Sequence, residues 1–326
     1  MNDRPQPLPK RKGATMKEGF AIGAGLIIAG LMLELSTGPI DWDAFAYPAN
    51  VVALAVLVIA IVAMHLLRRK VYVFRFMGTL QAAIPAMCYA VVLTTIMGLT
   101  RQTVSTPSQP LRMGGINNML TFWPFVLIYT YMAVILGLVV IQQFRTWAAT
   151  NFSLFTSSPT KGRLPVAFHA SLLFHLGLFI VLTTATLGSA DMQRLKMITS
   201  IDEPEWRAID QQGNIRELPL AIELKRFIME QYDDGSPRRF ASDIQILTKS
   251  GKNILCTVDV NKPVTVDGWK VYQYGYDTQL GAMSRISILE LVTDPWLPFV
   301  YVGIYLMLAG AVCMFLFGGQ IKLRGS

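Results

Sequence analysis

Long apolar runs dominate the pattern of hydrophobic and polar positions along the chain. An α-helix needs about 20 mainly apolar residues to cross a bilayer. Runs of suitable length lie near residues 19–37, 50–67, 76–99, 121–143, 164–188 and 296–318. A long polar stretch, residues 189–295, separates the fifth run from the sixth. The pattern predicts a polytopic α-helical membrane protein of about six transmembrane helices, with one polar domain between the fifth and sixth helices.

Within the polar stretch, apolar and polar residues alternate with a period of two, which is typical of half-buried β-strands. Ile244 and Ile246 follow this pattern, as do Val258 and Val260. Turn residues separate the runs, including an Asp-Gly pair at 267–268. The segment 218–227 fits a strand or a helix, and its proline and its alternation favour a strand. We therefore expect a small antiparallel β domain, either a sandwich or a barrel.

The distribution of charge predicts the topology. Charged residues make up 15% of the 326 residues, against about a quarter in soluble proteins. The polar stretch carries a net charge of −3 and the rest of the chain +11. Fourteen of the 16 basic residues outside the polar stretch fall near the N-terminus, in 68–75, in 145–163 and in the tail after 321, all on one side of a six-helix layout. The positive-inside rule then predicts cytoplasmic termini and an extracytoplasmic polar domain, so the positive charge indicates a lipid bilayer and no nucleic acid as partner.

This layout predicts six consecutive parts. They are a cytoplasmic basic tail (1–18), two N-terminal helices (19–75), three further helices (76–188), the extracytoplasmic β domain (189–295), a last helix (296–318) and a cytoplasmic tail (319–326).

The three histidines all lie in predicted helices, where an ionisable side chain is costly and is a functional candidate by default. His175 lies near the middle of the fifth helix, and Gly177 is expected to leave room for a flat ligand beside it. His65 and His169 lie toward the predicted cytoplasmic surface, where we expect side chains that reach headgroups or water. His169 and His175 are six residues apart, about 240° around a helix. A second ligand for a metal at His175 must therefore come from another helix or subunit.

Other polar residues offer no self-sufficient active site. The chain has no Cys-x-x-Cys pair, no Cys-x-x-Cys-His haem attachment motif, no glycine-rich phosphate loop and no His-Glu-x-x-His. Cys256 is the single cysteine of the polar domain, so that domain has no internal disulfide. Glu34, near the outer end of the first helix, is expected to extend toward the interface rather than to conduct protons.

Several motifs resemble those of one protein family. They are Phe-His-Leu-Gly-Leu-Phe at 174–179, Gly-Ser-Ala-Asp at 188–191, Arg-Phe-Ala-Ser-Asp-Ile at 239–244, Asp-Pro-Trp at 294–296, and a strand motif of Asn261, Pro263, Gly268, Trp269, Tyr272 and Gln273. Over about 76–318, the chain resembles the ResB (CcsB-type) proteins of cytochrome c synthesis system II. The two N-terminal helices lie outside this resemblance.

The resemblance implies a subunit of a cytochrome c synthase in a bacterial cytoplasmic membrane. With a CcsA-type partner, such a subunit exports haem across the membrane and delivers it to apocytochrome c. A family histidine that binds haem iron within the membrane corresponds to His175, which implies a haem b that is shared with the partner. His169 and His65 are further candidates for contact with haem. The chain lacks the tryptophan-rich haem motif of the CcsA side, so the resemblance implies one subunit of a haem lyase complex and no enzyme on its own.

Two alternatives to this function remain. A membrane scaffold could dock apocytochrome or thiol-redox partners without binding haem. A small-molecule transporter is the other alternative, but it would show paired intramembrane charges or broken helices in repeated halves, and the sequence has neither.

In the strand motif, we expect residues 261–268 to shape a tight hairpin. One face of its second strand is core, and the other face is a candidate for docking the partner or apocytochrome.

Overall fold

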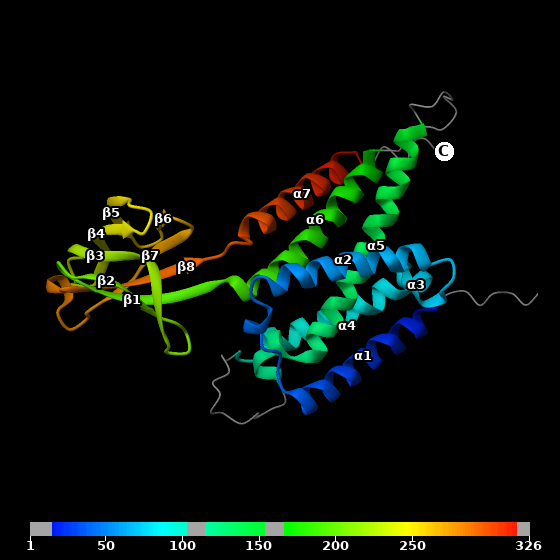
Figure 1. The fold of residues 1–326 in the computed structure, drawn as a ribbon, viewed down its shortest axis with the longest axis horizontal. Coiled ribbons are helices and arrows are strands. Elements are labelled where there is room, and N and C mark those ends of the chain that lie inside the picture. The colour runs from blue at the N-terminus through cyan, green and yellow to red at the C-terminus, as the bar shows by residue number, and fades with distance from the viewer. Residues whose placement is uncertain (1–14, 103–114, 154–165, 318–326) are drawn as a thin grey trace, which may run out of the picture. The chain divides into compact units, whose positions relative to one another are not determined.

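The computed structural model describes residues 15–102, 115–153 and 166–317 and divides into two units (Figure 1). The helical unit comprises the chain up to Leu187 and from Pro298 onward, and the sheet unit comprises Gly188–Leu297. Seven α-helices occur in the described residues: α1 (Met16–Thr37), α2 (Ala49–Leu67), α3 (Tyr72–Met77), α4 (Leu80–Leu99), α5 (Trp123–Ser153), α6 (Val166–Gly188) and α7 (Leu297–Phe317). All but the short α3 are long and apolar enough to span a membrane, which confirms the six predicted helices.

Two of the predicted helix boundaries were wrong. The third predicted helix started at residue 76, but the chain instead forms α3, breaks at Gly78 and Thr79, and starts α4 at Leu80. The Thr79 hydroxyl donates to the carbonyl oxygen of Phe76 (2.6 Å), which closes the end of α3. The fourth predicted helix ended at residue 143, but α5 continues to Ser153 and therefore includes Arg145.

One face of α1 is made almost entirely of glycine. The buried residues of this helix are Gly19, Gly23, Gly30 and Glu34, spaced by four, seven and four positions. A Cβ atom on any of the three glycines would lie within 2.7 Å of a heavy atom of α4 or α5. Small residues that allow two helix backbones to approach closely are typical of membrane helix contacts. The missing side chains therefore let α1 pack against both helices.

Glu34 ends this face, and the expectation that it extends toward the interface was wrong. The side chain is 5% exposed. Its Oε2 atom accepts the backbone N–H of Trp123 at 3.2 Å. That N–H belongs to the first turn of α5, where backbone donors have no partner within the helix and a carboxylate is favoured by the helix dipole. Glu34 therefore ties the end of α1 to the beginning of α5.

Helix α5 contacts both α2 and α6 at Gly137. A Cβ atom on Gly137 would lie 2.7 Å from Ile61 of α2 and 3.1 Å from Phe179 of α6. Ile61, Val134 and Leu138 form a buried cluster at this point, and Met77, at the end of α3, packs against it. The second helix, although outside the family resemblance, is thus packed on the helix that also contacts α6.

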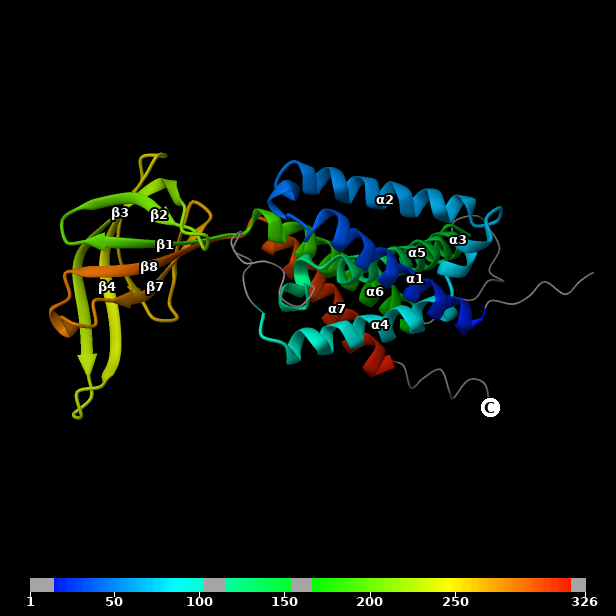
Figure 2. The same ribbon diagram turned by 90° about the horizontal axis from the view of Figure 1, so that it is seen from below.

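Helices α6 and α7 run antiparallel and meet at three glycines, and both views show them side by side (Figures 1 and 2). A Cβ atom on Gly177 would lie 2.5 Å from the carbonyl oxygen of Gly303. A Cβ atom on Gly310 would lie 2.7 Å from the carbonyl oxygen of Ala170. The expectation that Gly177 leaves room for a flat ligand was therefore wrong, because α7 fills that space.

The sheet unit is one antiparallel sheet of eight strands in the order β5-β4-β3-β2-β1-β8-β7-β6. The strands are β1 (Gln193–Ser200), β2 (Pro204–Ile209), β3 (Ile215–Gln231), β4 (Pro237–Thr248), β5 (Asn253–Asp259), β6 (Val264–Val266), β7 (Trp269–Tyr276) and β8 (Ile286–Thr293). This confirms the predicted antiparallel β domain between the fifth and last membrane helices. The segment 218–227 lies within β3, so the favoured choice of strand over helix was correct.

The sheet folds over so that its two end regions meet around one apolar core. Strand β5, at one edge, contacts β6 and β7 at the other. At this meeting point the carboxylate of Asp267, between β6 and β7, accepts a hydrogen bond from Ser250 (2.9 Å) and pairs with Lys252 (2.5 Å), both in the turn between β4 and β5. Fully buried side chains from both halves form the core, among them Met197, Ile222, Leu224, Ile244, Ile246, Leu289 and Leu291.

The glycine face of α1 leads to a matched pair of substitutions. Gly23→Val places a side chain within 2.4 Å of ring atoms of Tyr89, whose hydroxyl donates to Phe20 O at 3.0 Å and limits its retreat. Gly25, in the same helix, has nothing within 4 Å of its Cβ position. Overpacking of a tight contact costs about 1–3 kcal/mol. We expect Gly23→Val to lower the thermal unfolding temperature of the purified protein in detergent, and Gly25→Val to leave it nearly unchanged. Equal losses in both variants would show that the close α1 contact does not contribute to stability.

Candidate functional site

The ring of His175 is held by its own helix. Its Nδ1 atom lies 2.7 Å from the carbonyl oxygen of Ser171, one turn earlier in α6. A carbonyl oxygen only accepts hydrogen bonds, so Nδ1 carries the proton. The Ser171 hydroxyl lies 3.2 Å from the same nitrogen, and the amide nitrogen of Gln143, from α5, lies 3.5 Å away. The bond to the Ser171 carbonyl therefore fixes the ring of this half-buried side chain, and Gln143 Nε2 donates to the Ser171 hydroxyl at 3.2 Å.

With the proton on Nδ1, the Nε2 atom of His175 carries a free lone pair. No hydrogen bond to Nε2 occurs within the part of the chain that the structure describes. Metal-binding histidines commonly have this arrangement, in which one nitrogen donates to a carbonyl or carboxylate and the other binds the metal. The ring also contacts Phe174 edge-on, with centroids 5.9 Å apart. The site therefore fits an axial ligand of haem iron.

Further protein ligands do not gather near His175. Within the described residues, no three His, Cys, Asp or Glu side chains lie close enough together to hold a metal ion. A metal site with three or more such ligands from this part of the chain is therefore excluded, whereas a haem needs only one or two axial ligands from protein.

His65 lies in different surroundings from those expected. Its side chain is 3% exposed, so the prediction that it reaches headgroups or water was wrong. The Nη1 atom of Arg145 donates to His65 Nε2 at 3.0 Å. A guanidinium always donates, so this nitrogen is already occupied. His65 thus joins α2 to α5, and its proposed contact with haem stays a prediction.

His169 lies near the beginning of α6 and is half-buried. Its ring meets that of Phe168 edge-on, with centroids 6.3 Å apart. Its proposed contact with haem also stays a prediction.

The strand motif forms the expected hairpin. Strands β6 and β7 pair from Val264↔Val271 to Val266↔Trp269, and only Asp267 and Gly268 connect them. Both connecting residues have positive φ, 47° and 85°. Such a two-residue turn requires left-handed backbone, which glycine adopts at least cost.

The two faces of β7 differ as the alternation predicts. Trp269, Val271 and Gln273 are buried, whereas Tyr272 is half-buried and Tyr274 is 51% exposed. The ammonium group of Lys196 lies 3.8 Å from the centre of the Tyr274 ring. The inward face is therefore core, and the outward face, which carries both tyrosines, is the one available to a partner.

A buried polar cluster in the sheet was not foreseen from the sequence. Gln273 Nε2 donates to the Ser287 hydroxyl at 2.9 Å, and the Ser242 hydroxyl donates to the same oxygen at 2.8 Å. Thr199 donates to Ser287 O at 3.1 Å. Strands β1, β4, β7 and β8 are thus joined through hydrogen bonds in the core. The sequence did carry one signal of this burial, because Gln273 alternates in phase with Trp269 and Val271 and therefore lies on the same face of β7.

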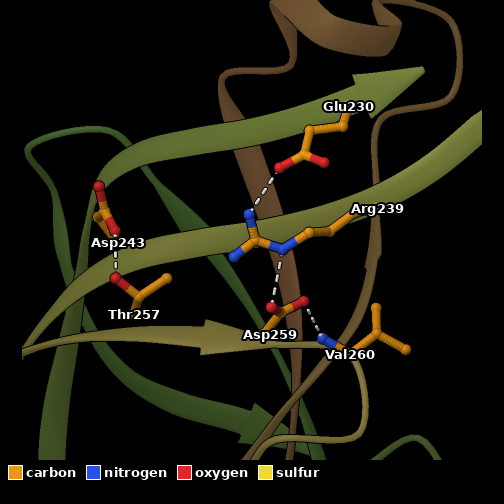
Figure 3. Close-up of polar contacts among 6 residues, drawn as sticks. All are labelled: Glu230, Arg239, Asp243, Thr257, Asp259 and Val260. Carbon is orange, nitrogen blue, oxygen red and sulfur yellow. Dashed lines mark hydrogen bonds and ion pairs between the residues drawn. The ribbon is translucent and has the colours of Figure 1, made fainter.

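Arg239 holds the turn that carries Asn261 (Figure 3). Its Nε atom donates to Asp259 Oδ2 and its Nη1 atom to Glu230 Oε1, both at 2.8 Å. The other oxygen of Asp259 accepts the backbone N–H of Val260 at 2.8 Å. Asn261 follows in the left-handed region, at φ 61°, and is exposed together with Pro263. The arginine motif at 239–244 therefore supports the exposed end of the strand motif.

The Gly-Ser-Ala-Asp motif at 188–191 and the Asp-Pro-Trp motif at 294–296 lie together, where the chain enters and leaves the sheet. Trp296 Nε1 donates to Asp191 Oδ2 at 2.7 Å. A Cβ atom on Gly188 would lie 2.4 Å from Trp296 Cβ, so only glycine lets the two segments approach. Asp294 Oδ1 accepts the backbone N–H groups of Trp296 and Leu297, both at 3.1 Å, at the beginning of α7. These contacts fix the points where the chain enters and leaves the sheet.

Comparisons with known proteins find similarity to the family that the motifs resemble. The ResB-like family model matches residues 160–287. A cytochrome c biogenesis protein CcsB of Prochlorococcus marinus subsp. pastoris is 28% identical over 119 residues, which cover 36% of this chain and 27% of that protein. A CcsB protein of Gloeobacter violaceus is 25% identical over 151 residues, which cover 44% of this chain and 30% of that protein. The matched parts therefore span less than a third of these relatives.

One solved structure, titled Cytochrome c Heme Lyase CcmF, is also similar. The alignment has a TM-score of 0.34 and 12% sequence identity, and it covers 92% of this chain and 46% of that chain.

Asp243, in the arginine motif, gives the sheet unit a predicted pH dependence. The hydrogen bond from the Thr257 hydroxyl (2.6 Å), together with the guanidinium of Arg226, holds the pKa of Asp243 below its usual value. A carboxyl whose pKa is lowered on folding stabilises the fold above its unfolded pKa, about 3.9, and this contribution is lost as the pH falls through the folded pKa. Thr257→Val should therefore cost about 1 kcal/mol at pH 7 and clearly less near pH 2, where Asp243 takes up a proton.

Thermal scans of the purified protein at the two pH values measure this difference. Thr265→Val, which removes the hydroxyl of the exposed Thr265 in β6, is the matched control and should have little effect at either pH. If Thr257→Val were equally destabilising at pH 7 and pH 2, ionised Asp243 would not be the group that the hydroxyl stabilises.

Proposed function

Because residues 160–287 of this chain are ResB-like, we propose that the protein is the ResB-type subunit of a cytochrome c synthase of system II. In this proposal it exports haem across the membrane with a CcsA-type partner and delivers it to apocytochrome c. The names of the CcsB relatives support a role in cytochrome c biogenesis. The observation that carries the part concerning haem is the free Nε2 atom of His175, because the other ring nitrogen already donates to Ser171.

In the proposed site, His175 Nε2 is the axial ligand of a haem b in transit. Bound haem supplies an iron centre that accepts the lone pair of a neutral imidazole. The Ser171 carbonyl keeps the proton on Nδ1 and makes the free nitrogen a better donor, since a hydrogen bond from the far side of the ring raises its basicity. Gln143 supports this arrangement from α5, because its Nε2 atom donates to the Ser171 hydroxyl at 3.2 Å.

The second axial ligand is proposed to come from the CcsA-type partner. His65 Nε2 is bonded to Arg145, and His169 is about 240° away from His175 around α6. Neither histidine can therefore complete the site without rearrangement. If each subunit supplies one of the two axial ligands, the haem is attached to this chain by one bond, which suits a cargo that must be released.

The sheet unit is proposed to be extracytoplasmic and to contact apocytochrome or the partner through the outer face of β7. Both termini are proposed to be cytoplasmic, in a bacterial cytoplasmic membrane. The clusters of Lys and Arg residues outside 189–295 support this orientation, because clustered cations resist translocation. The outward tyrosines support the docking face, because Tyr is enriched in protein interfaces. The buried Trp269 and Gln273 have a structural role.

His175→Gly tests the haem site. We expect loss of cytochrome c maturation and of haem from the purified complex, measured by the visible spectrum and the pyridine haemochrome. Because glycine leaves a space where imidazole can bind, added imidazole should restore part of both. His169→Ala, in the same helix, is the control and should have a mild effect.

Two results would contradict this assignment. Full haem content and maturation in His175→Gly would remove the histidine from the site and favour the scaffold that does not bind haem. Loss of haem that imidazole does not restore, in a variant with a normal thermal unfolding temperature, would give His175 a role other than ligation.

Cysteine labelling tests the proposed orientation. In a background where Cys88, Cys256 and Cys313 are replaced by alanine, Gln211→Cys places a thiol in an exposed turn of the sheet unit. Gly325→Cys places one in the tail. A membrane-impermeant maleimide on intact cells should label the first and reach the second only after permeabilisation. Labelling of both sites in intact cells would rule out this orientation, since the clustered cations would then have been translocated.

A further inference from the structure

Two neighbouring cavities lie at the end of the helical unit where α2 ends and α4 begins. One has a volume of about 580 Å³ and is lined by Gly78, Thr79 and Gln142 in addition to arginines. The other has a volume of about 480 Å³ and is lined by Glu18 and the segment 70–72. Arg68, Arg69 and Arg75 line both, so the two form the lobes of one arginine cavity.

The positive charge of the arginine cavity is not neutralised within the described part of the chain. None of the three arginines has a carboxylate within 4.0 Å there. Glu18, the carboxylate of the lining, accepts hydrogen bonds from the hydroxyls of Tyr72 (2.7 Å) and Thr15 (3.2 Å). Four cations, the arginines and Lys70, therefore face one carboxylate, and the cavity favours an anion.

The first lobe also offers an uncharged donor. The side-chain amide of Gln142 makes no hydrogen bond to the residues that the structure describes, and a Cβ atom on Gly78 would lie 2.4 Å from its Nε2 atom. Glycine at 78 therefore gives this amide the space to lie in the cavity. A donor amide beside guanidinium groups suits an oxyanion with several acceptor oxygens.

Apolar side chains next to the arginine cavity indicate what else the ligand carries. Leu67 is the last residue of α2 and Leu80 the first of α4, both membrane-length helices. Leu66, Leu67 and Leu80 are 71%, 43% and 72% exposed. In a bilayer such side chains face acyl chains, so the cavity lies where polar headgroups begin. A free anion would use the arginines but leave this apolar border without contacts.

We infer that the arginine cavity binds an anionic phospholipid, and that its two lobes take the two phosphates of cardiolipin. Guanidinium groups pair with phosphate oxygens in a bidentate manner. Basic pockets between membrane helices are a known type of cardiolipin site. Arg68, Arg69 and Arg75 line both lobes, so they are placed to pair with either phosphate, whereas a lipid with one phosphate would fill one lobe. This inference does not depend on the proposed haem site.

Native mass spectrometry of the purified full-length protein in detergent tests the inference. The protein is titrated with cardiolipin, phosphatidylglycerol, phosphatidylcholine and inorganic phosphate in separate experiments. We expect cardiolipin to bind most tightly and inorganic phosphate not to displace it at millimolar concentration. Arg75→Gln should weaken cardiolipin binding about fivefold or more, since one cation near anionic lipid contributes about 1 kcal/mol.

Two matched variants separate a built site from general surface charge. Lys17→Gln removes one exposed charge outside the lining and should weaken binding less than twofold. Gln142→Leu keeps every charge, loses only the amide and should weaken binding about threefold. If Arg75→Gln fails to fold, Gln142→Leu still decides the matter.

Several results would overturn the inference. Equal effects of Arg75→Gln and Lys17→Gln, or unchanged binding in Gln142→Leu, would show attraction by surface charge alone. Displacement of cardiolipin by inorganic phosphate would identify a site for a free anion. Displacement by haem, with the same dependence on Arg75, would assign the cavity to the haem carboxylates.

Discussion

Close approach of helix backbones at glycine is the contact on which the helical unit depends. In a bilayer, lipid is as apolar as the side chains, so helices associate through packing and hydrogen bonds rather than hydrophobic burial. The α6–α7 contact at Gly177 also sets the direction of the candidate ligand His175. His175 precedes Gly177 by two residues, about 200° around the helix. Because Gly177 packs on α7, His175 points away from α7, toward Gln143 of α5.

Polar side chains within the membrane helices find partners in two ways, either on a neighbouring helix or on their own helix. Glu34 accepts an N–H of α5, and His65 accepts a hydrogen bond from Arg145, so each joins two helices. His175 donates to a carbonyl of its own helix. That bond contributes nothing to helix association, but it fixes the tautomer and leaves a nitrogen free for a ligand. His65 accepts at Nε2, so the proton of the neutral ring lies on Nδ1, whereas His175 keeps a free lone pair on Nε2.

The sequence predicted the elements that depend on local period and missed those that depend on distant partners. Six apolar runs, the strand alternation and the Asp-Gly turn are local patterns, and each was found. The break at Gly78 was missed because apolar residues continue on both sides of it. The burial of His65 was missed because its partner, Arg145, is 80 residues away and was taken for a loop residue. Gly177 showed that a side chain was absent, but not that α7 fills the space. The candidate ligand His175 was named from its depth and from the family resemblance, but its free nitrogen could be identified only from the position of Ser171.

The chain enters and leaves the sheet unit at neighbouring points. Strands β1 and β8 pair along their whole lengths, from Gln193↔Thr293 to Ser200↔Ile286, and Asp191 bonds Trp296 just beyond them. Domains with adjacent ends can be inserted into a host without rerouting its chain. Since α6 and α7 pack through their own glycines, they form a helical hairpin with packing contacts outside the sheet unit. The sheet unit is thus a cassette in this hairpin, and evolution or an engineer could exchange it for another recognition module while the membrane helices stay in place.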